Sequence, residues 1–315
     1  MACPLRRWSQ DRGRLRVQRD TVTEPGTALL MSRFAFDAAA LFLWGSSAYL
    51  LSMPPSELRD WLWQRLSGAR WCAIGTATVV TLASLPLRTA ELSGSWSAMR
   101  DTALLARVAT QTTLGCAWLC QMIAVALLLA TSLPPRRCRA PAVALSSALM
   151  LGSLTLSGHA AMHAGALGWL HQGNDWLHLL AGGFWFGALL PVLLLLGQLG
   201  TRGAQRPAAL ALTRFSQWGH IAVAVVLLSG AVNTGLIVGD WPDDWSMTYQ
   251  RLLGIKVALV LVMVLVALYN RYRLVPRLAA TPGALIRLKR ATLLELTVAT
   301  AVIALVAAFG MMQPR

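Results

Sequence analysis

Charged residues are scarce in this chain. Only 13% of its 315 residues are Asp, Glu, Lys or Arg, whereas 56% are hydrophobic and the mean hydropathy is +0.55. Soluble domains carry about a quarter of their residues as charges, so this composition excludes an ordinary soluble protein. It favours a chain that is surrounded by lipid over most of its length.

Acidic residues are the scarcest of the charged ones. The chain has 13 Asp and Glu against 28 Lys and Arg, which gives a formal net charge of +15. The cations lie in short segments between apolar stretches, and the sequence has no basic face interleaved with aromatic residues. Such placement is typical of the loops of membrane proteins. We therefore expect membrane lipid around the chain and no nucleic acid as a partner.

Cysteines are few, and the common catalytic motifs are missing. The five cysteines are an odd number without a Cys-x-x-Cys pair, so no disulfide framework is implied. P-loop, dinucleotide-binding and hydrolase signatures are absent, so we do not expect an enzyme. Cys116 and Cys120 stand one helical turn apart and fit either soft ligands for Cu(I) or small interior residues.

Long apolar stretches are what the sequence does contain. Eight of them approach the roughly 20 residues that a helix needs to span a bilayer. They cover residues 30–52, 71–92, 110–133, 141–164, 174–199, 215–238, 250–273 and 291–313. We predict an all-α fold, a polytopic transmembrane helix bundle of about eight spans. It forms one domain over residues 30–315, preceded by an Arg-rich tail over residues 1–29, and Met31 is an alternative translation start.

The connections between these stretches predict the orientation. Cations gather near residues 134–140, 200–214 and 271–290, which we expect to be cytoplasmic. The connection near residues 165–174 has no cation and that near 239–249 carries three aspartates, so both should face the opposite side. An even number of spans then puts both termini outside. This conflicts with the six arginines before residue 20, because arginines are expected on the cytoplasmic side. A translation start at Met31 would remove these arginines and the conflict.

Four of the five histidines lie within twenty residues of one another, in the fourth and fifth expected spans. They are His159, His163, His171 and His178. On one continuous helix, His159, Met162 and His163 would share a face, because they stand at i, i+3 and i+4. His159 follows the cytoplasmic start of its span by about 18 residues, or roughly 27 Å. We therefore predict a histidine cluster at the outer end of the bundle.

The chemistry of this cluster points to a metal. Imidazole and thioether groups bind copper, and the thioether favours Cu(I). Histidines near a membrane interface can also merely satisfy backbone or lipid head groups, but polar groups inside spans are costly and tend to be functional. We predict copper ligation by His159, His163 and His178, with Met162 and His171 as further candidates. The alternative is a haem protein in which His159 or His163 pairs with His178 as axial ligands.

Two further polar residues lie near the cytoplasmic ends of their spans. His220 is interpreted as structural, because it is separated from the other histidines. Glu295 fits either part of an exit path or a partner for a nearby Arg or Lys.

Several short segments, taken in order, resemble a known family. These segments are Ser157–His159, Asp175–Leu180, Trp185–Gly187, Arg214–Ser216, Ser229–Asn233, Arg251–Lys256, Asn270–Pro276 and Leu293–Glu295. They resemble the copper-resistance protein D (CopD) family of bacterial inner-membrane proteins. The resemblance is best from about residue 150 to the end of the chain.

This resemblance implies a function, a location and a partner. It implies a multi-pass protein that moves copper across the bacterial inner membrane in copper resistance and homeostasis, with uptake from the periplasm as the expected direction. It also implies a separate periplasmic copper carrier of the CopC type as a partner, and it places His159 and His178 on the copper path. A haem-binding membrane protein acting in electron transfer or as an oxidoreductase stays the alternative.

Overall fold

The computed structural model describes residues 25–131, 133, 135–239, 245–278, 283–310 and 312, and over these residues the structure is helical without strands. The elements are α2 (Pro25–Ser52), α3 (Glu57–Arg65), α4 (Ser67–Ser93), η2 (Trp96–Arg100), α5 (Thr102–Gln111), α6 (Thr113–Ala130), α7 (Arg136–Leu154), η3 (His159–Ala161), α8 (Gly165–Gln198), α9 (Gln205–Val238), α10 (Thr248–Tyr269), η4 (Asn270–Leu274), η5 (Val275–Arg277) and α11 (Ala284–Phe309). The predicted all-α bundle is confirmed. Helices are the expected outcome because lipid cannot satisfy backbone N–H and C=O groups.

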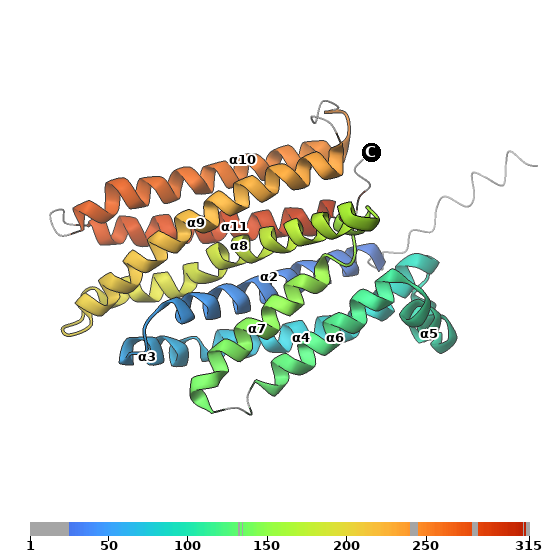
Figure 1. Cartoon of the computed structure of the whole chain (residues 1–315), viewed down its shortest axis with the longest axis horizontal. Coiled ribbons are helices and arrows are strands. Elements are labelled where there is room, and N and C mark those ends of the chain that lie inside the picture. Colours follow the sequence, from blue (N-terminus) through green and yellow to red (C-terminus); the bar gives the residue numbers. More distant parts are fainter. Residues whose placement is uncertain are drawn as a thin grey trace, which may run out of the picture.

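Two helices run through the middle of the bundle. α2 and α8 lie against each other, with α4, α6 and α7 on one side and α9, α10 and α11 on the other (Figure 1). One apolar core, which includes Leu43 and Leu128, joins α2 to α4, α6 and α7. A second, which includes Tyr49 and Leu195, joins α2 and α8 to α9 and α11. α2 therefore holds the two sides of the bundle together.

Glycines allow α2 and α8 to touch through their backbones. Gly183 and Gly187 of α8 are four residues apart, the small-residue spacing that lets membrane helices approach closely. A Cβ atom added to Gly45 of α2 would clash with the Gly183 carbonyl oxygen and lie 2.8 Å from Gly187 Cα. Beside this contact, the Trp44 indole donates a 2.8 Å hydrogen bond to the Leu180 carbonyl. The position of α8 is thus fixed against α2.

Seven described helices are long and apolar enough to cross a membrane, and they are α2, α4, α6, α8, α9, α10 with η4 and η5, and α11. The expected fourth span corresponds to α7, which runs through the bundle beside them (Figure 1). Its 19 residues are about 28 Å long, and three arginines in its first turns lower its hydropathy. α2 begins and α11 ends at the same end of the bundle, as an even number of crossings requires (Figure 1).

Several predicted span boundaries were wrong. α9 and α11 begin ten and seven residues earlier than expected, and the differences at α7 and α8 affect the site. α7 ends at Leu154, ten residues before the expected end of its span, and Gly158 then takes a φ of +79°, which a right-handed helix cannot accommodate. α8 begins at Gly165, nine residues earlier than expected, so His171 lies inside a helix rather than in a loop. His159 and His163 consequently do not share one face of a continuous helix.

The start of the chain also differs from the expectation. α2 begins at Pro25, five residues before the expected first span, and it contains Met31 within its second turn. Residues 1–24 of the predicted tail lie outside the described residues.

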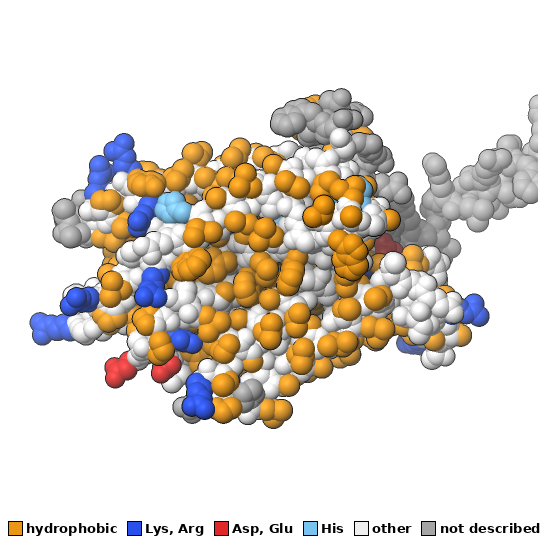
Figure 2. Space-filling model, viewed as in Figure 1, with side chains coloured by type: hydrophobic (Ala, Val, Ile, Leu, Met, Phe, Trp, Pro, Cys, Tyr) orange, Lys and Arg blue, Asp and Glu red, His pale blue; other side chains and the backbone are white. Residues whose placement is uncertain are grey.

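The two ends of the bundle differ in charge. We call the end formed by the α7–α8 connection the histidine end, and the end formed by the α8–α9 and η5–α11 connections the arginine-rich end. On the face of the molecule drawn in Figure 2, most of the Lys and Arg side chains lie at the arginine-rich end. The three connections expected to be cytoplasmic all lie there (Figure 1). The charge distribution therefore follows the positive-inside pattern.

Candidate metal centre

Two of the predicted site residues are in direct contact at the histidine end. His163 lies in the connection before α8, and His171 lies in the second turn of α8. Their Nδ1 atoms are 3.1 Å apart, which is a hydrogen bond in which one ring donates and the other accepts. The side chain of His171 is fully buried, and its Nε2 atom has no hydrogen-bond partner.

His159 is held in a similar way by other elements. It opens η3, and its ring packs edge-on against Tyr249 of α10, with the ring centroids 5.3 Å apart. The Phe309 carbonyl at the end of α11 accepts a hydrogen bond from this ring, and the remaining Nε2 atom is buried without a partner. Burial and, after it, the positive charge of Arg33 lower the pKa of His159 below the ordinary value of 6.5. His159 is therefore neutral at neutral pH.

The two buried Nε2 atoms are what this arrangement offers to a ligand. The hydrogen bond with His163 fixes Nδ1 of His171, and the Phe309 backbone and the Tyr249 ring hold the His159 ring, so in both histidines Nε2 has a lone pair or a proton that nothing satisfies. Metal-binding histidines in proteins are commonly held in this way, with one nitrogen bonded to the protein and the other on the metal. His159 and His171 therefore each offer one nitrogen to a metal, and they are near enough to interact electrostatically, while His163 orients the His171 ring.

The histidine end does not form a complete metal cage. Over the described residues, no group of three or more His, Cys, Asp or Glu side chains is placed to hold one ion. Met162 is 52% exposed at the surface beside these histidines. Its thioether is thus free to supply a soft ligand to an ion that arrives from outside.

His178, the remaining predicted ligand, is not brought together with the others. It lies two helical turns further along α8 than His171, about 10.5 Å deeper in the bundle. Its Nδ1 atom is 2.9 Å from the Ser229 hydroxyl of α9. The ring lies against Gly230, where an added Cβ atom would be only 3.2 Å from His178 Cε1. A copper ion on His159 and His171 would therefore reach His178 only by moving into the bundle.

A polar network fills the level between His171 and His178. The Asn174 amide donates to the Ser229 carbonyl at 2.9 Å and to Asn233 Oδ1 at 2.7 Å. Asn233 in turn donates to Asp175 Oδ1 at 2.9 Å. Lys256 of α10 interacts electrostatically with Asp175. Carboxylate and amide oxygens at this depth give a cation polar surroundings inside the membrane.

Only part of this network is among the residues named from the sequence. Asp175, Asn233 and Lys256 lie in the segments that resemble the family, whereas Asn174, at the expected start of the fifth span, was given no role. The sequence does contain a signal for this network. Four polar residues stand at i, i+3, i+4 and i+7, the spacing that places side chains on one face of a helix, and they are His171, Asn174, Asp175 and His178. On α2, Arg33 and Asp37 form an ion pair, with the Arg33 Nε and Asp37 Oδ2 atoms 3.9 Å apart.

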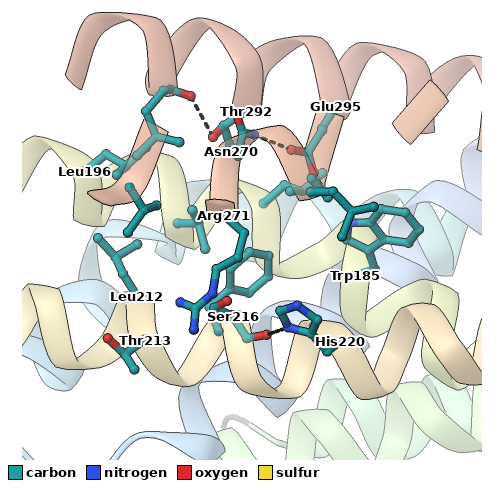
Figure 3. Close-up of a pocket in the computed structure, with 18 of the residues that line it drawn as sticks. Trp185, Leu196, Leu212, Thr213, Ser216, His220, Asn270, Arg271, Thr292 and Glu295 are labelled. Atoms are coloured by element: carbon teal, nitrogen blue, oxygen red, sulfur yellow. Dashed lines mark hydrogen bonds between the residues drawn. The ribbon is translucent and has the colours of Figure 1, made fainter. Parts of the chain in front are cut away.

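His220 lies apart from the histidine cluster, as predicted. It is not near the end of its helix, however, because α9 begins at Gln205, 15 residues or about 22 Å before it. His220 lines a cavity of about 380 Å³ between α8, α9, α10, η4 and α11, together with Trp185, Asn270 and Glu295 (Figure 3). Its Nδ1 atom is 2.5 Å from the Ser216 carbonyl one turn earlier, and its Nε2 atom is 3.4 Å from the Tyr272 hydroxyl. The molecule therefore has two polar regions, one at the histidine end and one inside the half of the bundle towards the arginine-rich end.

Comparison with known proteins places the chain in a family. The model for the N-terminal domain of copper resistance protein D-like proteins matches residues 22–169, and the model for copper resistance protein D matches residues 209–309. The inner membrane protein YebZ of Escherichia coli K12 is 32% identical over 248 residues, which cover 78% of this chain and 84% of YebZ. The chain belongs to the copper resistance protein D family.

Other relatives have names that refer to copper. Copper resistance protein D of Pseudomonas syringae pv. tomato is 32% identical over 75% of this chain and 80% of that protein. The copper transport protein CutJ of Bacillus subtilis 168 is 28% identical over 61% of this chain and 36% of CutJ. No solved structure matches the chain.

Family membership confirms the resemblance and extends it. The matched regions include the first half of the bundle, where the sequence segments gave little guidance. His159 and His163 fall within the first matched region, whereas His171 and His178 fall between the two regions. The chain is thus a multi-pass helical membrane protein of a copper-resistance family.

Proposed function

We propose that this protein carries copper across the bacterial inner membrane, taking the ion at the histidine end and delivering it at the arginine-rich end. The observation that carries this proposal is the pair of buried, unpartnered Nε2 atoms of His159 and His171. An unsatisfied nitrogen at such depth is costly unless something binds it, and copper is the ion to which the family and its ligand chemistry point.

The arrangement supports uptake. The positive-inside pattern makes the arginine-rich end cytoplasmic, so the histidine end faces the periplasm. A periplasmic carrier of the CopC type would then deliver copper to exposed Met162, from which the ion moves to His171 and His159. From there the polar network around Asp175 leads to His178. Copper is the cargo here, and the protein acts as a carrier rather than an enzyme.

The copper content of the purified protein tests the histidine end directly. The paired substitution His159→Ala and His171→Ala should abolish copper binding there, because both free Nε2 atoms are lost. His220→Ala is the matched control, since it removes a histidine at the opposite end, and it should bind copper as the unmodified protein does. Equal copper content in the paired variant would contradict the proposed site.

Copper accumulation by cells tests transport. Cells that produce the protein should accumulate more copper than cells that lack it, and cells with the paired variant should match the latter. Unchanged copper content would contradict transport. A visible absorption spectrum of the same purified sample separates the haem alternative, because a Soret band without bound copper would favour haem over copper.

A further inference from the structure

The cavity near the arginine-rich end contains a buried carboxyl group that the copper site does not use. Glu295 of α11 is only 5% exposed. Asn270 donates a 2.6 Å hydrogen bond to Glu295 Oε1 (Figure 3). The Trp185 side chain of α8 also donates to the same carboxyl group. Three elements of the bundle therefore converge on this one side chain.

Over the described residues, no Lys or Arg forms an ion pair with Glu295. Of the two roles considered from the sequence, that of a partner for a nearby Arg or Lys is therefore not found among these residues. The charged and titratable groups around the cavity are His220 of α9, Arg271 and Tyr272 of η4, and Tyr49 of α2, which packs on Phe215 at the cavity wall. Figure 3 shows the Arg271 guanidinium directed away from Glu295, towards Ser216.

This environment suits a group that gains and loses a proton. An ionised carboxylate inside a membrane without a cation is costly, whereas the protonated acid is neutral. The two N–H donors, from Trp185 and Asn270, stabilise the ionised form. Asn270 Oδ1, beside the carboxyl group, is a buried acceptor without a partner over the described residues, so it is placed to receive a proton-bearing water.

Helix α8 connects this carboxyl group to the histidine end. His171, His178 and Trp185 follow one another at intervals of seven residues, so they lie on the same face of α8, about 10.5 Å apart. A copper ion that leaves His178 along this face therefore approaches Glu295. Inside the membrane the attraction between such charges is much stronger than in water.

We propose that Glu295 is an exchangeable proton site, reached from the arginine-rich end, whose proton leaves when a copper ion enters the inner half of the bundle and returns when the ion departs. The carboxyl O–H bond breaks, and the proton passes to water in the cavity and on to the cytoplasm. The carboxylate that remains offsets the charge of the ion without ligating it. When a proton returns from the cytoplasm, this attraction ends and the ion is released. The inference rests on the proposed copper transport.

Copper uptake into right-side-out membrane vesicles tests this proposal, because their lumen is the former cytoplasm and its pH can be set independently. For the unmodified protein, uptake should slow as the lumenal pH is raised, by up to about tenfold per pH unit for release that needs one proton. Glu295→Gln should bind copper normally at the histidine end, transport it more slowly and lose the dependence on lumenal pH. Glu295→Asp should keep that dependence.

A control and a second measurement complete the test. Glu57→Gln changes an exposed carboxylate of α3 and should behave as the unmodified protein. In infrared difference spectra of the unmodified protein, copper should remove the C=O band of a protonated carboxyl group, and this change should be missing in Glu295→Gln. Wild-type pH dependence in Glu295→Gln, or no carboxyl band change, would overturn the inference while leaving copper transport standing. Absence of copper uptake by the unmodified protein would instead refute the proposed function.

Discussion

The histidine end and the arginine-rich end are both polar, but their polar groups are satisfied in different ways. At the histidine end, His159 and His171 each keep one buried nitrogen without a partner, and the surrounding groups come from short connections as well as helices. In the half of the bundle towards the arginine-rich end, about 16.5 Å along α11, Glu295 lies among donors from α8 and η4, inside a cavity with mostly apolar walls. This difference is the basis for our proposals that the first end receives an ion and that Glu295 changes its charge.

The contact between α2 and α8 keeps these two ends in a fixed relation. α8 carries His171 and His178 towards one end and Trp185 towards the other. Its position depends on backbone contact with α2 at Gly45, Gly183 and Gly187. A change in this contact therefore acts on both ends, whereas changes at one end should leave the other intact.

The largest effect is expected from Gly45→Ala. This substitution should disturb both ends of the bundle, because α8 carries residues of both. The new Cβ atom would clash with the Gly183 carbonyl, so the two helices must separate, at a cost of about 3 kcal/mol or more. We expect a lower melting temperature in detergent and loss of both copper binding and uptake. Gly75→Ala on α4, where the added atom meets open space, should melt no lower than the unmodified protein.

The next largest effect should distinguish copper binding at the histidine end from the movement of copper deeper into the bundle. His171→Ala removes a free Nε2 atom, and we expect copper affinity to fall about 10- to 100-fold. His178→Ala, deeper on α8, should leave copper affinity nearly unchanged but slow copper uptake. Isothermal titration and vesicle uptake measure the two quantities. If both variants lost affinity equally, the two histidines would belong to one site rather than to successive positions.

The smallest effect concerns the stability of the histidine end as a function of pH. Because the pKa of His159 is lowered in the folded protein, the unfolded chain binds more protons below about pH 6.5. Stability is therefore complete above that pH and decreases as the pH falls towards the folded-state pKa. The melting temperature should drop by a few degrees on mild acidification, and less so in His159→Gln. An equal drop in both proteins would show that another group is responsible.

Much of the fold could be predicted from the sequence, because lipid imposes helices on long apolar stretches. Most of the expected spans fall on observed helices, and the cation-rich connections gather at one end as predicted. The depth of the histidine cluster also followed from the span order. The ends of α7 and α8 could not be predicted, since apolar residues continue through the connection between them. Gly158 and Gly165 interrupt the helical path there through their positive φ angles.

Which residues contact one another in the candidate site could be learned only from the tertiary structure. The sequence grouped His159, Met162 and His163 by helical spacing, but in the structure His163 contacts His171 and His159 contacts Tyr249. These pairings depend on how the α7–α8 connection folds onto α8, α10 and α11, which no local pattern encodes. For the same reason the partners of Glu295 were missed, because Trp185 and Asn270 are far from it in sequence.

The sequence by itself determined that this protein is a helical membrane bundle, that cations gather at one of its ends and that histidines gather at the other. These features follow from hydropathy and charge, which act residue by residue along the chain. Only the tertiary structure decided which histidine nitrogens stay free and which carboxyl group lies without a cation, because hydrogen bonds between distant helices satisfy some polar groups and leave others open.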